Sequence, residues 1–283
     1  MIKKIIRFFL FLFLIISIII IYSRYEATSN LITNEITIKD NINESYNGLK
    51  IVHFSDLHYG RIISDEQIDK VIKEINSLKP DIVVFTGDLI DDNKNIKNDE
   101  FLTNSLSKIT AKYGKYAILG DDDYSNEEQV IRILNNSDFQ LLNNFYDVIF
   151  NENNEKIFIG GIGSSLKNDD DLSITMNYFE NNDANMYKIL LIHEPDYIDT
   201  IIQSHDNVNL VLAGHSHLGQ IRLPLLGAVV TKRGYEKYPD SHYKIENTNL
   251  YVSSGIGVSH YNFRLFNNPS INLYRINNTN EKE

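Results

Sequence analysis

The sequence predicts an α/β protein with a parallel sheet at its core, preceded by an N-terminal transmembrane helix. Two observations support this prediction. From about residue 30 onward, short apolar runs alternate with stretches whose hydrophobic residues recur at helical spacing, and strands that alternate with helices form parallel sheets. Ahead of this region, a basic cluster is followed by a long apolar run.

The N-terminal segment is predicted to anchor the chain in a membrane. Three basic residues, Lys3, Lys4 and Arg7, precede an uncharged run over residues 8–22. The stretch over residues 5–22, counted past Arg7, is just long enough to cross a bilayer. A buried core helix is not expected, because the run is apolar all round.

A cleaved signal peptide is the alternative for this segment. The only small-residue cleavage site, at residues 27–29, lies far from the apolar run, which favours the anchor. Basic residues on the N-terminal side favour a cytoplasmic N-terminus, whereas Arg24 and Lys39 on the other flank weaken that orientation. We therefore predict a single-pass protein of the cell membrane with an extracytoplasmic domain, or a secreted protein if the segment is cleaved.

The remainder of the chain is predicted to form one domain. The expected division is an anchor with a short linker over residues 1–29, a domain over residues 30–276 and a frayed tail over residues 277–283. No repeat, low-complexity block or internal linker interrupts the domain.

Local patterns predict the individual elements. A capping box of Ser64 and Gln67 begins a helix, and Pro80 marks the region where it stops. The predicted buried face of this helix comprises Ile68, Val71, Ile72 and Ile75. Ser125 and Glu128 form a second predicted capping box. The predicted strands cover residues 34–40, 48–56, 81–88, 115–121, 156–163, 187–195, 208–215 and 249–257, and the predicted helices cover residues 64–80, 100–112 and 125–134.

Composition excludes several classes of protein. The chain has 283 residues, enough for a sizeable core, and 42% of them are hydrophobic. Its formal net charge of -11 argues against nucleic-acid binding, which depends on Lys and Arg contacts to phosphate. Because cysteine is absent, disulfides, zinc–thiolate sites and thiol nucleophiles are excluded. The sequence contains no signal for an oligomeric state.

Ionisable residues gather at the carboxyl ends of the predicted strands. The motifs SDLH, GDL, GDDD, IHEP and AGHSH each follow an apolar run. Ligands of open α/β sheets bind outside these strand ends, so one rim should carry the side chains. They are Asp56, His58, Asp88, Asp121, His193, His215 and His217. Asp56 and His58 are two positions apart, as are His215 and His217, so each pair points to one side if strand geometry persists that far.

This set of side chains predicts a centre for two divalent metal ions. Carboxylates and imidazoles together suit Mn, Fe, Zn, Co or Ni, and the set is larger than one four-coordinate zinc site needs. Two ions about 3.5–4 Å apart that share a bridging carboxylate activate a water and neutralise a phosphoryl oxygen. The chemistry that this pattern predicts is metal-assisted hydrolysis of a phosphoester.

The order of the motifs DLH, GD, GDDD, H and GHSH resembles the calcineurin-like metallophosphoesterase family, whose pattern is DxH, GD, GNH(D/E), H and GHxH. The resemblance runs from about residue 50 to residue 276. The segments HEPDY, AGHSHLGQIRLP, YVSSGIG and RLFNNPSI look like the membrane-associated bacterial branch, which includes enzymes similar to UDP-diacylglucosamine pyrophosphatases. The fold that the resemblance implies is a two-sheet β-sandwich flanked by helices.

The resemblance also implies roles for the motif residues and a class of substrate. A first ion would be held by Asp56, His58 and His217, and a second by Asp121, His193 and His215, with Asp88 bridging the two. The implied substrate is a phosphodiester or pyrophosphate. A lipid-linked or nucleotide-sugar compound fits an anchor that holds the site near the bilayer.

The chain departs from the family pattern at residues 121 and 122. Asp121 stands where the family has Asn, and it still offers a ligating oxygen. Asp122 stands where the family has a His that contacts the substrate phosphate or assists the leaving group, and a carboxylate cannot imitate a cationic imidazole. We therefore expect an intact metal site that lacks the usual acid. The alternative function is a catalytically weakened metal-binding or ligand-sensing module of the same fold, and a purely structural surface protein would leave the ordered motifs unexplained.

Three residues are candidates for catalytic roles beside the metal ligands. They are Asp122, Asp123 and His260. Asp123 either orients its neighbours or is a solvated turn residue. His260 lies on a loop that could reach the cleft, where it would contact substrate or supply a proton.

Other polar residues are expected to be structural. His53 lies inside a predicted strand and should be a core histidine with satisfied hydrogen bonds, while His205 and His242 should lie on the surface. Asp91 and Asp92 are expected in a solvated loop rather than at a third metal site. Tight backbone turns beside the metals are expected at Gly87, Gly120 and Gly214.

Overall fold

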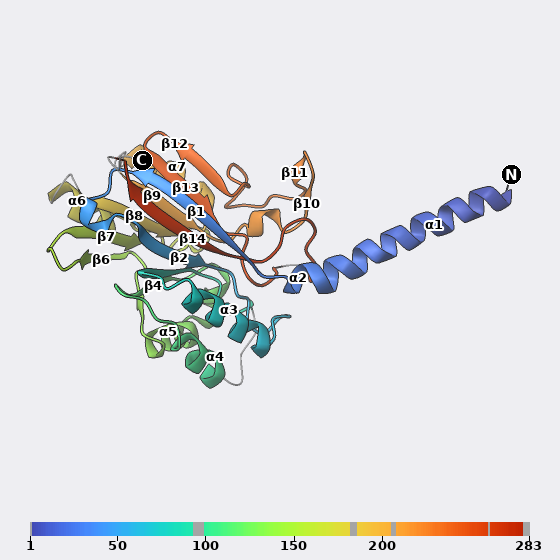
Figure 1. Ribbon diagram of the computed structural model, residues 1–283, viewed down its shortest axis with the longest axis horizontal. Helices are drawn as coiled ribbons and strands as arrows, with labels where there is room; N and C mark the ends of the chain where they lie inside the picture. Colours follow the sequence, from blue (N-terminus) through green and yellow to red (C-terminus); the bar gives the residue numbers. More distant parts are fainter. Residues whose placement is uncertain (1, 93–98, 182–185, 205–207, 260, 280–283) are drawn as a thin grey trace.

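Two six-stranded sheets packed face to face form the body of the computed structural model (Figure 1). The structure describes residues 2–92, 99–181, 186–204, 208–259 and 261–279. The first sheet has the strand order β1 (Ile32–Asp40), β14 (Ser270–Asn278), β2 (Leu49–Phe54), β3 (Ile82–Thr86), β4 (Lys115–Ile118) and β5 (Phe139–Leu141). The second has the order β12 (His242–Ile245), β13 (Thr248–Val252), β9 (Leu210–Ala213), β8 (Tyr187–Ile192), β7 (Lys156–Gly161) and β6 (Phe145–Phe150). A short hairpin pairs β10 (Arg222–Leu223) with β11 (Gly227–Ala228).

The centre of each sheet is parallel, as predicted. In the first sheet β2, β3, β4 and β5 run parallel, and in the second β7, β8, β9 and β13 do so. Within the two six-stranded sheets, the antiparallel pairs are β14 with β2 and the two outer pairs of the second sheet. Parallel neighbours end at the same edge, so the loops that follow β2, β3, β4, β8 and β9 emerge together.

Both faces of each sheet are covered, which explains why the central strands are apolar without interruption. In β2, Ile51 points into the core between the two sheets, whereas Val52 and Phe54 point to the layer beneath the helices. The second sheet repeats the alternation, with Leu191 facing the inter-sheet core and Leu190 facing outward. The result is the two-sheet α/β fold flanked by helices that the sequence predicted.

Helices cover the outer face of each sheet (Figure 1). The first sheet is covered by α3 (Asp65–Ser77), α4 (Asp99–Leu106) and α5 (Glu127–Asn136), and the second by α6 (Leu172–Asn181) and α7 (Ile198–Ser204). The predicted capping box of Ser64 and Gln67 is present at the start of α3. The buried residues of α3 are those predicted, Ile68, Val71, Ile72 and Ile75.

Two details of the predicted helices are wrong. The helix expected over residues 100–112 ends at Leu106, because Asn76 of α3 bonds the backbone of Lys108 and Thr110, which therefore leave the helical path. The capping box expected at Ser125 does not form. Its hydroxyl donates to Asp92 instead, and α5 starts after a 3₁₀ helix, η3 (Asp122–Asn126).

The C-terminal strand extends further than expected. Asn277 and Asn278 were predicted to lie in a frayed tail, but β14 continues to Asn278. The backbone of this strand pairs in parallel with β1 along its whole length, from Ile32 opposite Ser270 to Asp40 opposite Asn278. Residues 280–283 lie outside the described part of the chain.

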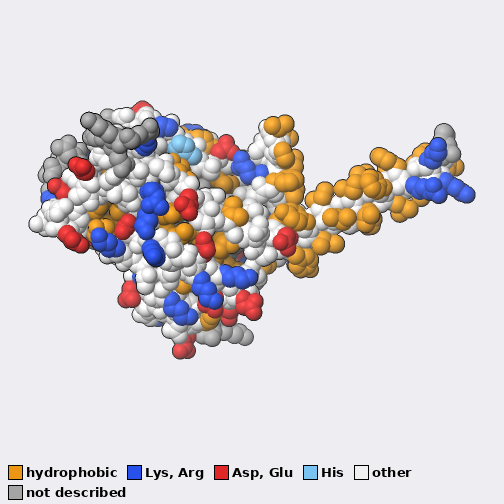
Figure 2. All heavy atoms as spheres, in the orientation of Figure 1, with side chains coloured by type: hydrophobic (Ala, Val, Ile, Leu, Met, Phe, Trp, Pro, Cys, Tyr) orange, Lys and Arg blue, Asp and Glu red, His pale blue; other side chains and the backbone are white. Residues whose placement is uncertain are grey.

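The N-terminal helix α1 (Ile2–Ile21) projects away from the two sheets (Figure 1). Together with the π-helical turn η1 (Tyr22–Glu26) and α2 (Ala27–Ser29), it forms a helix of 28 residues that is long and apolar enough to cross a membrane. Figure 2 shows its hydrophobic side chains exposed on the visible face, with basic side chains at the N-terminal tip. By length and composition, this helix is a candidate membrane span.

The base of this helix is attached to the rest of the molecule. Ser23 and Ala27 are buried, and the backbone N–H of Arg264 donates to the carbonyl of Ser23 over 2.9 Å. Arg24 also donates to the carbonyl of Asn262. Residues from about 22 onward therefore contact the rest of the molecule, although the predicted anchor and linker extend to residue 29.

Two truncations test these contacts. We expect the chain to fold without α1, and deleting residues 1–21 should leave the free energy of unfolding nearly unchanged. Deleting residues 1–29 should lower it by about 1–3 kcal/mol, because the bond to Ser23 and the burial of Ala27 are lost. Urea denaturation of both proteins measures the difference. Equal stability of the two would show that residues 22–29 contribute nothing to the fold.

His53 is a core histidine, as predicted. It is fully buried in β2, where Nε2 lies 2.8 Å from the hydroxyl of Thr86 and Nδ1 lies 3.5 Å from the hydroxyl of Tyr274. Burial lowers the pKa of His53 to about 3. His53 is therefore neutral in the folded protein at any ordinary pH.

Burial of this imidazole should make stability depend on pH. The unfolded chain takes up a proton at His53 below about pH 6.5, whereas the folded chain does so only near pH 3. Stability should therefore fall with decreasing pH in this window, by at most about 1.4 kcal/mol per pH unit. His53→Gln keeps a polar partner for Thr86 but does not titrate. Urea denaturation from pH 7 to pH 5 should show a shallower slope for the variant, and identical slopes would contradict the assignment.

Candidate metal centre

Seven predicted metal ligands converge at the carboxyl ends of the parallel strands. Asp56 and His58 follow β2, Asp88 follows β3, Asp121 follows β4, His193 follows β8, and His215 and His217 follow β9. Their ligand atoms form two groups that could each hold a metal ion, and a third such group, His58, Asp88 and Asp122, overlaps both. The first group consists of Asp56, His58 and His217, and the second of Asp88, Asp121, His193 and His215.

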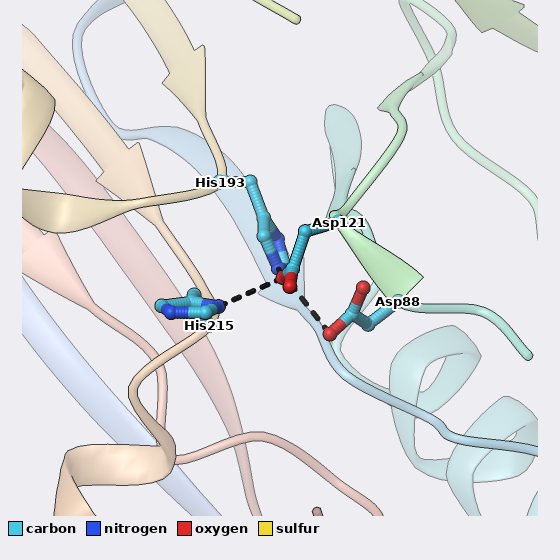
Figure 3. A group of neighbouring side chains, drawn as sticks. All are labelled: Asp88, Asp121, His193 and His215. Carbon is cyan, nitrogen blue, oxygen red and sulfur yellow. Dashed lines mark hydrogen bonds and ion pairs between the residues drawn. The ribbon is translucent and has the colours of Figure 1, made fainter. Parts of the chain in front are cut away.

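The second group is held by short contacts between carboxylates and imidazoles. Oδ1 of Asp121 lies 2.9 Å from Nδ1 of His215 and 3.2 Å from Nε2 of His193. Nε2 of His193 also lies 3.3 Å from Oδ2 of Asp88. Figure 3 shows His215 and Asp88 approaching Asp121 and His193 from opposite sides. The four ligand atoms therefore surround one small volume.

The first group is more deeply buried. Nε2 of His58 lies 3.0 Å from Nε2 of His217, and the two rings stack with centroids 5.0 Å apart. Nε2 of His217 lies 3.6 Å from Oδ1 of Asp56. Oδ2 of Asp56 is buried and finds no hydrogen-bond partner among the described residues. A buried carboxylate oxygen without a donor is costly unless a cation is bound to it, so this observation fits a metal site.

Asp88 connects the two groups. Its Oδ2 lies 3.6 Å from Nε2 of His58 and 3.3 Å from Nε2 of His193, so one oxygen faces a histidine of each group. The other oxygen, Oδ1, accepts the backbone N–H of Asp122 over 2.9 Å.

Two of the four histidines are oriented as metal ligands usually are, with the outer nitrogen hydrogen-bonded to a carbonyl oxygen, and the outer nitrogen of His58 faces a carboxylate without a hydrogen bond to it. Nδ1 of His193 donates to the carbonyl of Thr86 over 2.6 Å, and Nε2 of His215 donates to the carbonyl of Arg233 over 3.0 Å. Nδ1 of His58 lies 3.3 Å from Oδ2 of Asp122. In each case the second ring nitrogen faces the cluster. The donor set of carboxylate oxygens and imidazole nitrogens therefore fits divalent transition metals.

His217 is oriented by a different partner. Its Nδ1 lies 3.1 Å from Nη2 of the buried Arg264, and a guanidinium can only donate hydrogen bonds. Before an ion binds, the proton of this imidazole is therefore on Nε2, which points toward His58. A metal ion could bind this nitrogen only if that proton moved to Nδ1, in place of the contact with Arg264, because neutral imidazole binds a metal through its unprotonated nitrogen.

The backbone at the ligands is left-handed rather than extended. The φ angle is 54° at Asp56, 44° at His58, 60° at Asp88, 63° at His215 and 44° at His217, although none of these residues is glycine. Such conformations are strained and persist only where surrounding contacts enforce them. Here the backbone N–H of Asp56 bonds the carbonyl of Gly87, and the N–H of His58 bonds the carbonyl of Asp88.

The strand geometry assumed for the residue pairs does not persist to the ligands. β2 ends at Phe54 and β9 at Ala213. Asp56 and His58 still fall in one group, but His215 and His217 fall in different groups, so the expectation that both pairs point to one side is wrong for the second. The left-handed turn at each of these histidines redirects their side chains to the two groups.

The glycines beside the ligands allow close approach of the backbone, as expected. Gly87 has a φ angle of 92°, and a Cβ there would overlap the backbone of Gly120. A Cβ at Gly120 would overlap Asp88, and one at Gly214 would overlap Ser55.

The three aspartates at 121–123 have separate surroundings. Asp121 faces His193 and His215, whereas Asp122 faces His58. Asp123 is fully buried and accepts the backbone N–H groups of Gly120, Asp88 and Leu89 over 2.8–2.9 Å. Asp123 therefore orients its neighbours and is not a solvated turn residue.

Burial and mutual charge shift the pKa values of the cluster in opposite directions. Burial raises the pKa of Asp88 to about 7, although the charge of His193 opposes this shift. For His58 burial alone would lower the pKa, but the interaction with Asp122 and the charges of Asp88 and Asp56 raise it to about 9. The pKa of His217 is lowered well below its ordinary value by burial and by the charges of His58 and Arg264. Before an ion binds, protons on His58 compensate part of the carboxylate charge.

Several other sequence expectations can be compared with the structure. Asp91 was expected in a solvated loop, but it is buried, because Nε of Arg61 pairs with it over 3.2 Å and His58 lies close by. Asp92 is exposed, as expected. His242 is exposed and stacks on Tyr251. His205 and His260 lie outside the described residues.

Sequence reasoning missed three polar residues near the cluster. Arg264, in the loop before β14, is fully buried and supports His217. Arg61 and Lys232 lie near the carboxylates of the cluster and add positive charge there. Arg264 begins the segment RLFNNPSI, which was singled out in the sequence without a role for this residue, whereas Arg61 and Lys232 belong to no such motif. Each of the three reaches the cluster from a loop, so only the tertiary structure shows what it contacts.

Comparison with known proteins places this site in a family context. The family model described as calcineurin-like phosphoesterase matches residues 49–219, which include all seven predicted ligands. An uncharacterised metallophosphoesterase of Bacillus subtilis, YkuE, is 31% identical over 263 residues, covering 92% of this chain and 90% of that protein. A second uncharacterised metallophosphoesterase of the same organism, YkoQ, is 28% identical over 270 residues. The match covers 90% of this chain and 94% of YkoQ.

A vertebrate relative is described as a membrane protein. The transmembrane protein with metallophosphoesterase domain of Danio rerio is 27% identical over 228 residues, covering 76% of this chain. The match spans 50% of the zebrafish protein, about half its length. Taken with the match of the family model and the relative that is 31% identical, the ordered cluster of Asp and His residues shows that this chain belongs to the calcineurin-like phosphoesterase family of phosphoester hydrolases.

Proposed function

We propose that this protein is a membrane-anchored phosphoesterase that uses two divalent metal ions to hydrolyse a phosphodiester or pyrophosphate bond. The observation that carries the proposal is the position of Asp88. One of its oxygens faces His58 of the first group and His193 of the second, as a carboxylate bridging two ions would. The ions would be Mn, Fe, Zn, Co or Ni, which suit this mixture of ligands.

In this proposal Asp56, His58 and His217 hold one ion, and Asp121, His193 and His215 hold the other. The bound ions would supply Lewis acidity toward a phosphoryl oxygen and lower the pKa of the attacking water. Arg61 and Lys232 adjoin the cluster and would attract an anionic substrate to it. Thr86 and Arg233 provide the carbonyls that keep His193 and His215 in the tautomer a metal ligand requires.

Asp122 is a poor proton donor in this setting. Burial alone would raise its pKa, but the interaction with His58 outweighs burial and the net shift is downward. An ionised carboxylate cannot protonate a leaving group. We therefore propose that the enzyme lacks the acid that other family members have at this position and acts on bonds with good leaving groups.

The substrate that we propose is a lipid-linked or nucleotide-sugar pyrophosphate. The support is the apolar helix α1, which would hold the domain at a membrane, and the resemblance to UDP-diacylglucosamine pyrophosphatase-like enzymes. We further propose that the helix spans the cell membrane once with the domain on the outer side, in accordance with the basic residues Lys3, Lys4 and Arg7 at its N-terminal end. Cleavage after the helix would instead give a secreted enzyme.

A second candidate function is a metal-binding or ligand-sensing module that hydrolyses phosphoesters only slowly. The observation that favours it is the contact of Asp122 with His58, because a carboxylate at this point would repel a substrate phosphate.

Removing the proposed bridge should empty the centre. Wild-type protein loaded with Mn²⁺ should hold about two ions per chain, and Asp88→Asn should hold almost none, because the two groups then lose their shared ligand. His217→Ala should mainly reduce the first ion and His215→Ala the second. Elemental analysis after gel filtration measures the number of metal ions per chain. The matched control is Asp92→Asn, which changes an exposed carboxylate. An Asp88→Asn protein with two ions at full occupancy would disprove the bridge.

The same proteins test the activity. Wild type with Mn²⁺ should hydrolyse bis(p-nitrophenyl) phosphate, and Asp88→Asn should lose this turnover. A wild-type protein that holds two ions but turns over none of a panel of phosphodiesters and pyrophosphates would favour the sensing module instead.

The effect of an Asp122 substitution on the rate of hydrolysis should depend on whether the leaving group needs a proton. A positioned acid contributes about 10²–10⁴-fold to the rate when the leaving group needs a proton. At saturating metal, Asp122→His should therefore raise the hydrolysis of an alkyl phosphodiester relative to an aryl one by at least about tenfold. Asp122→Asn serves as the control that removes the carboxylate without adding an acid. Equal changes for the two substrates would show that residue 122 does not limit leaving-group departure.

A further inference from the structure

Exposed apolar side chains cluster on two loops beside the base of α1. The β10–β11 hairpin carries Leu225 and Leu226, which are 106% and 78% exposed, and continues to Val229 and Val230, which are also exposed. The loop before β14 carries Tyr261 and Phe266, 56% and 63% exposed. Figure 2 shows the hydrophobic surface of the hairpin beside that of the helix base. We call these two segments the apolar loops.

The tip of the hairpin is an unfavourable place for leucine in water. The backbone N–H of Leu226 donates to the carbonyl of Leu223, which closes a β-turn with Pro224 and Leu225 at its centre. Leu225 is the third residue of this turn and has a φ angle of 70°. Glycine is favoured at a turn position with a positive φ angle. The chain thus places a bulky apolar side chain in a strained conformation at the most exposed point of the turn.

The apolar loops form one unit with the base of the helix. Gln220 donates to the carbonyls of Tyr261 and Phe263, and the backbone N–H of Arg222 bonds the carbonyl of Leu265, so the hairpin is fixed to the second loop. That loop is fixed to the helix, because Arg264 bonds the carbonyl of Ser23. In Figure 1, β10 and β11 lie on the same side of the molecule as α2.

Charge distinguishes this unit from the rest of the chain. Residues 218–233 contain three basic residues and no Asp or Glu, and residues 261–269 contain one basic residue and no Asp or Glu. The chain as a whole carries a formal net charge of -11. Arg264 is fully buried and Arg222 pairs with Asp240, so the distinguishing feature of these two segments is the lack of acidic side chains beside the candidate membrane span.

We propose that the apolar loops insert into the interfacial region of the lipid bilayer that α1 spans. Leu225 and Leu226 at the tip would enter the acyl boundary, and Tyr261 and Phe266 would lie at headgroup level as interfacial aromatics do. No Asp or Glu within residues 218–233 or 261–269 would oppose anionic headgroups. This inference rests on the proposed anchoring by α1. A bilayer is the occupant favoured over a second copy of the chain, because the loops are continuous with a helix that is itself apolar on all sides.

Insertion of the loops would fix the position of the metal centre relative to the bilayer. The hairpin begins directly after η6 (His217–Gly219), which contains a proposed ligand. At its other end the chain passes to Arg233, whose carbonyl holds His215. The metal centre is thus connected to both ends of the hairpin, so a phosphoester in a lipid headgroup would meet it without leaving the membrane surface.

Site-specific fluorescence on the full chain tests this proposal. Because the chain has no cysteine, Leu226→Cys or Phe266→Cys can be labelled uniquely with an environment-sensitive NBD dye. Phe150→Cys, at a phenylalanine of β6 that is 52% exposed, is the matched control. Each protein is reconstituted into vesicles of phosphatidylcholine and phosphatidylglycerol, with or without nitroxide on the acyl chains.

We expect blue-shifted emission at positions 226 and 266 and quenching by the lipid nitroxide at least about twofold stronger than at position 150. Adding Leu225→Asp and Leu226→Asp to the Phe266→Cys protein should weaken its quenching while the protein still floats with the vesicles.

Three results would overturn the proposal. If the protein floats with vesicles but the NBD dye at positions 226 and 266 emits as it does in water, the loops do not insert. The anchoring by α1 would be unaffected by that result. Blue-shifted emission that lipid nitroxide does not quench would indicate burial against a second copy of the chain. Protein that does not float with vesicles would overturn both the anchoring by α1 and this inference. It would not affect the proposed metal-dependent hydrolysis, which the assays of Asp88→Asn test separately.

Discussion

Burial of negative charge at the strand ends is the constraint on which the rest of this structure depends. Asp56 and Asp123 are fully buried and Asp88 is 3% exposed, and all three lie within one cluster of loops. Asp123 is compensated by backbone N–H groups, and Asp88 by Asp122 N–H and His193. Oδ2 of Asp56 has no such partner among the described residues, which is compatible with a bound cation at this point.

The three consecutive aspartates satisfy this constraint because the backbone there is a 3₁₀ helix. With three residues per turn, successive side chains point about 120° apart. Asp121 at the N-cap of η3 therefore turns to His193 and His215, Asp122 turns to His58, and Asp123 turns back to the loop that carries Asp88. Three negative charges in a row are tolerated because each has separate partners.

The sequence predicted the parts of this structure that depend on local pattern. Runs buried on both faces identified the central strands, the capping box located α3, and the motif order brought the seven ligands to one edge. Contacts distant in sequence decided the rest. Ser125 bonds Asp92 instead of capping α5, Arg61 draws Asp91 into the interior, and left-handed backbone separates His215 from His217. Arg264 lies in the segment RLFNNPSI, but its role could not be predicted, because its partners, His217 and backbone carbonyls, are brought close only by the fold.

Arg264 connects the N-terminal helix to the candidate metal centre. Its backbone N–H bonds Ser23 at the base of the helix, while its guanidinium bonds the carbonyls of Gly255 and Gly257 and lies against Nδ1 of His217. Burial lowers the pKa of this guanidinium to about 9, so it is still charged at neutral pH. Together with burial and the charge of His58, it lowers the pKa of His217. One buried residue thus contacts both the base of the N-terminal helix and a predicted metal ligand.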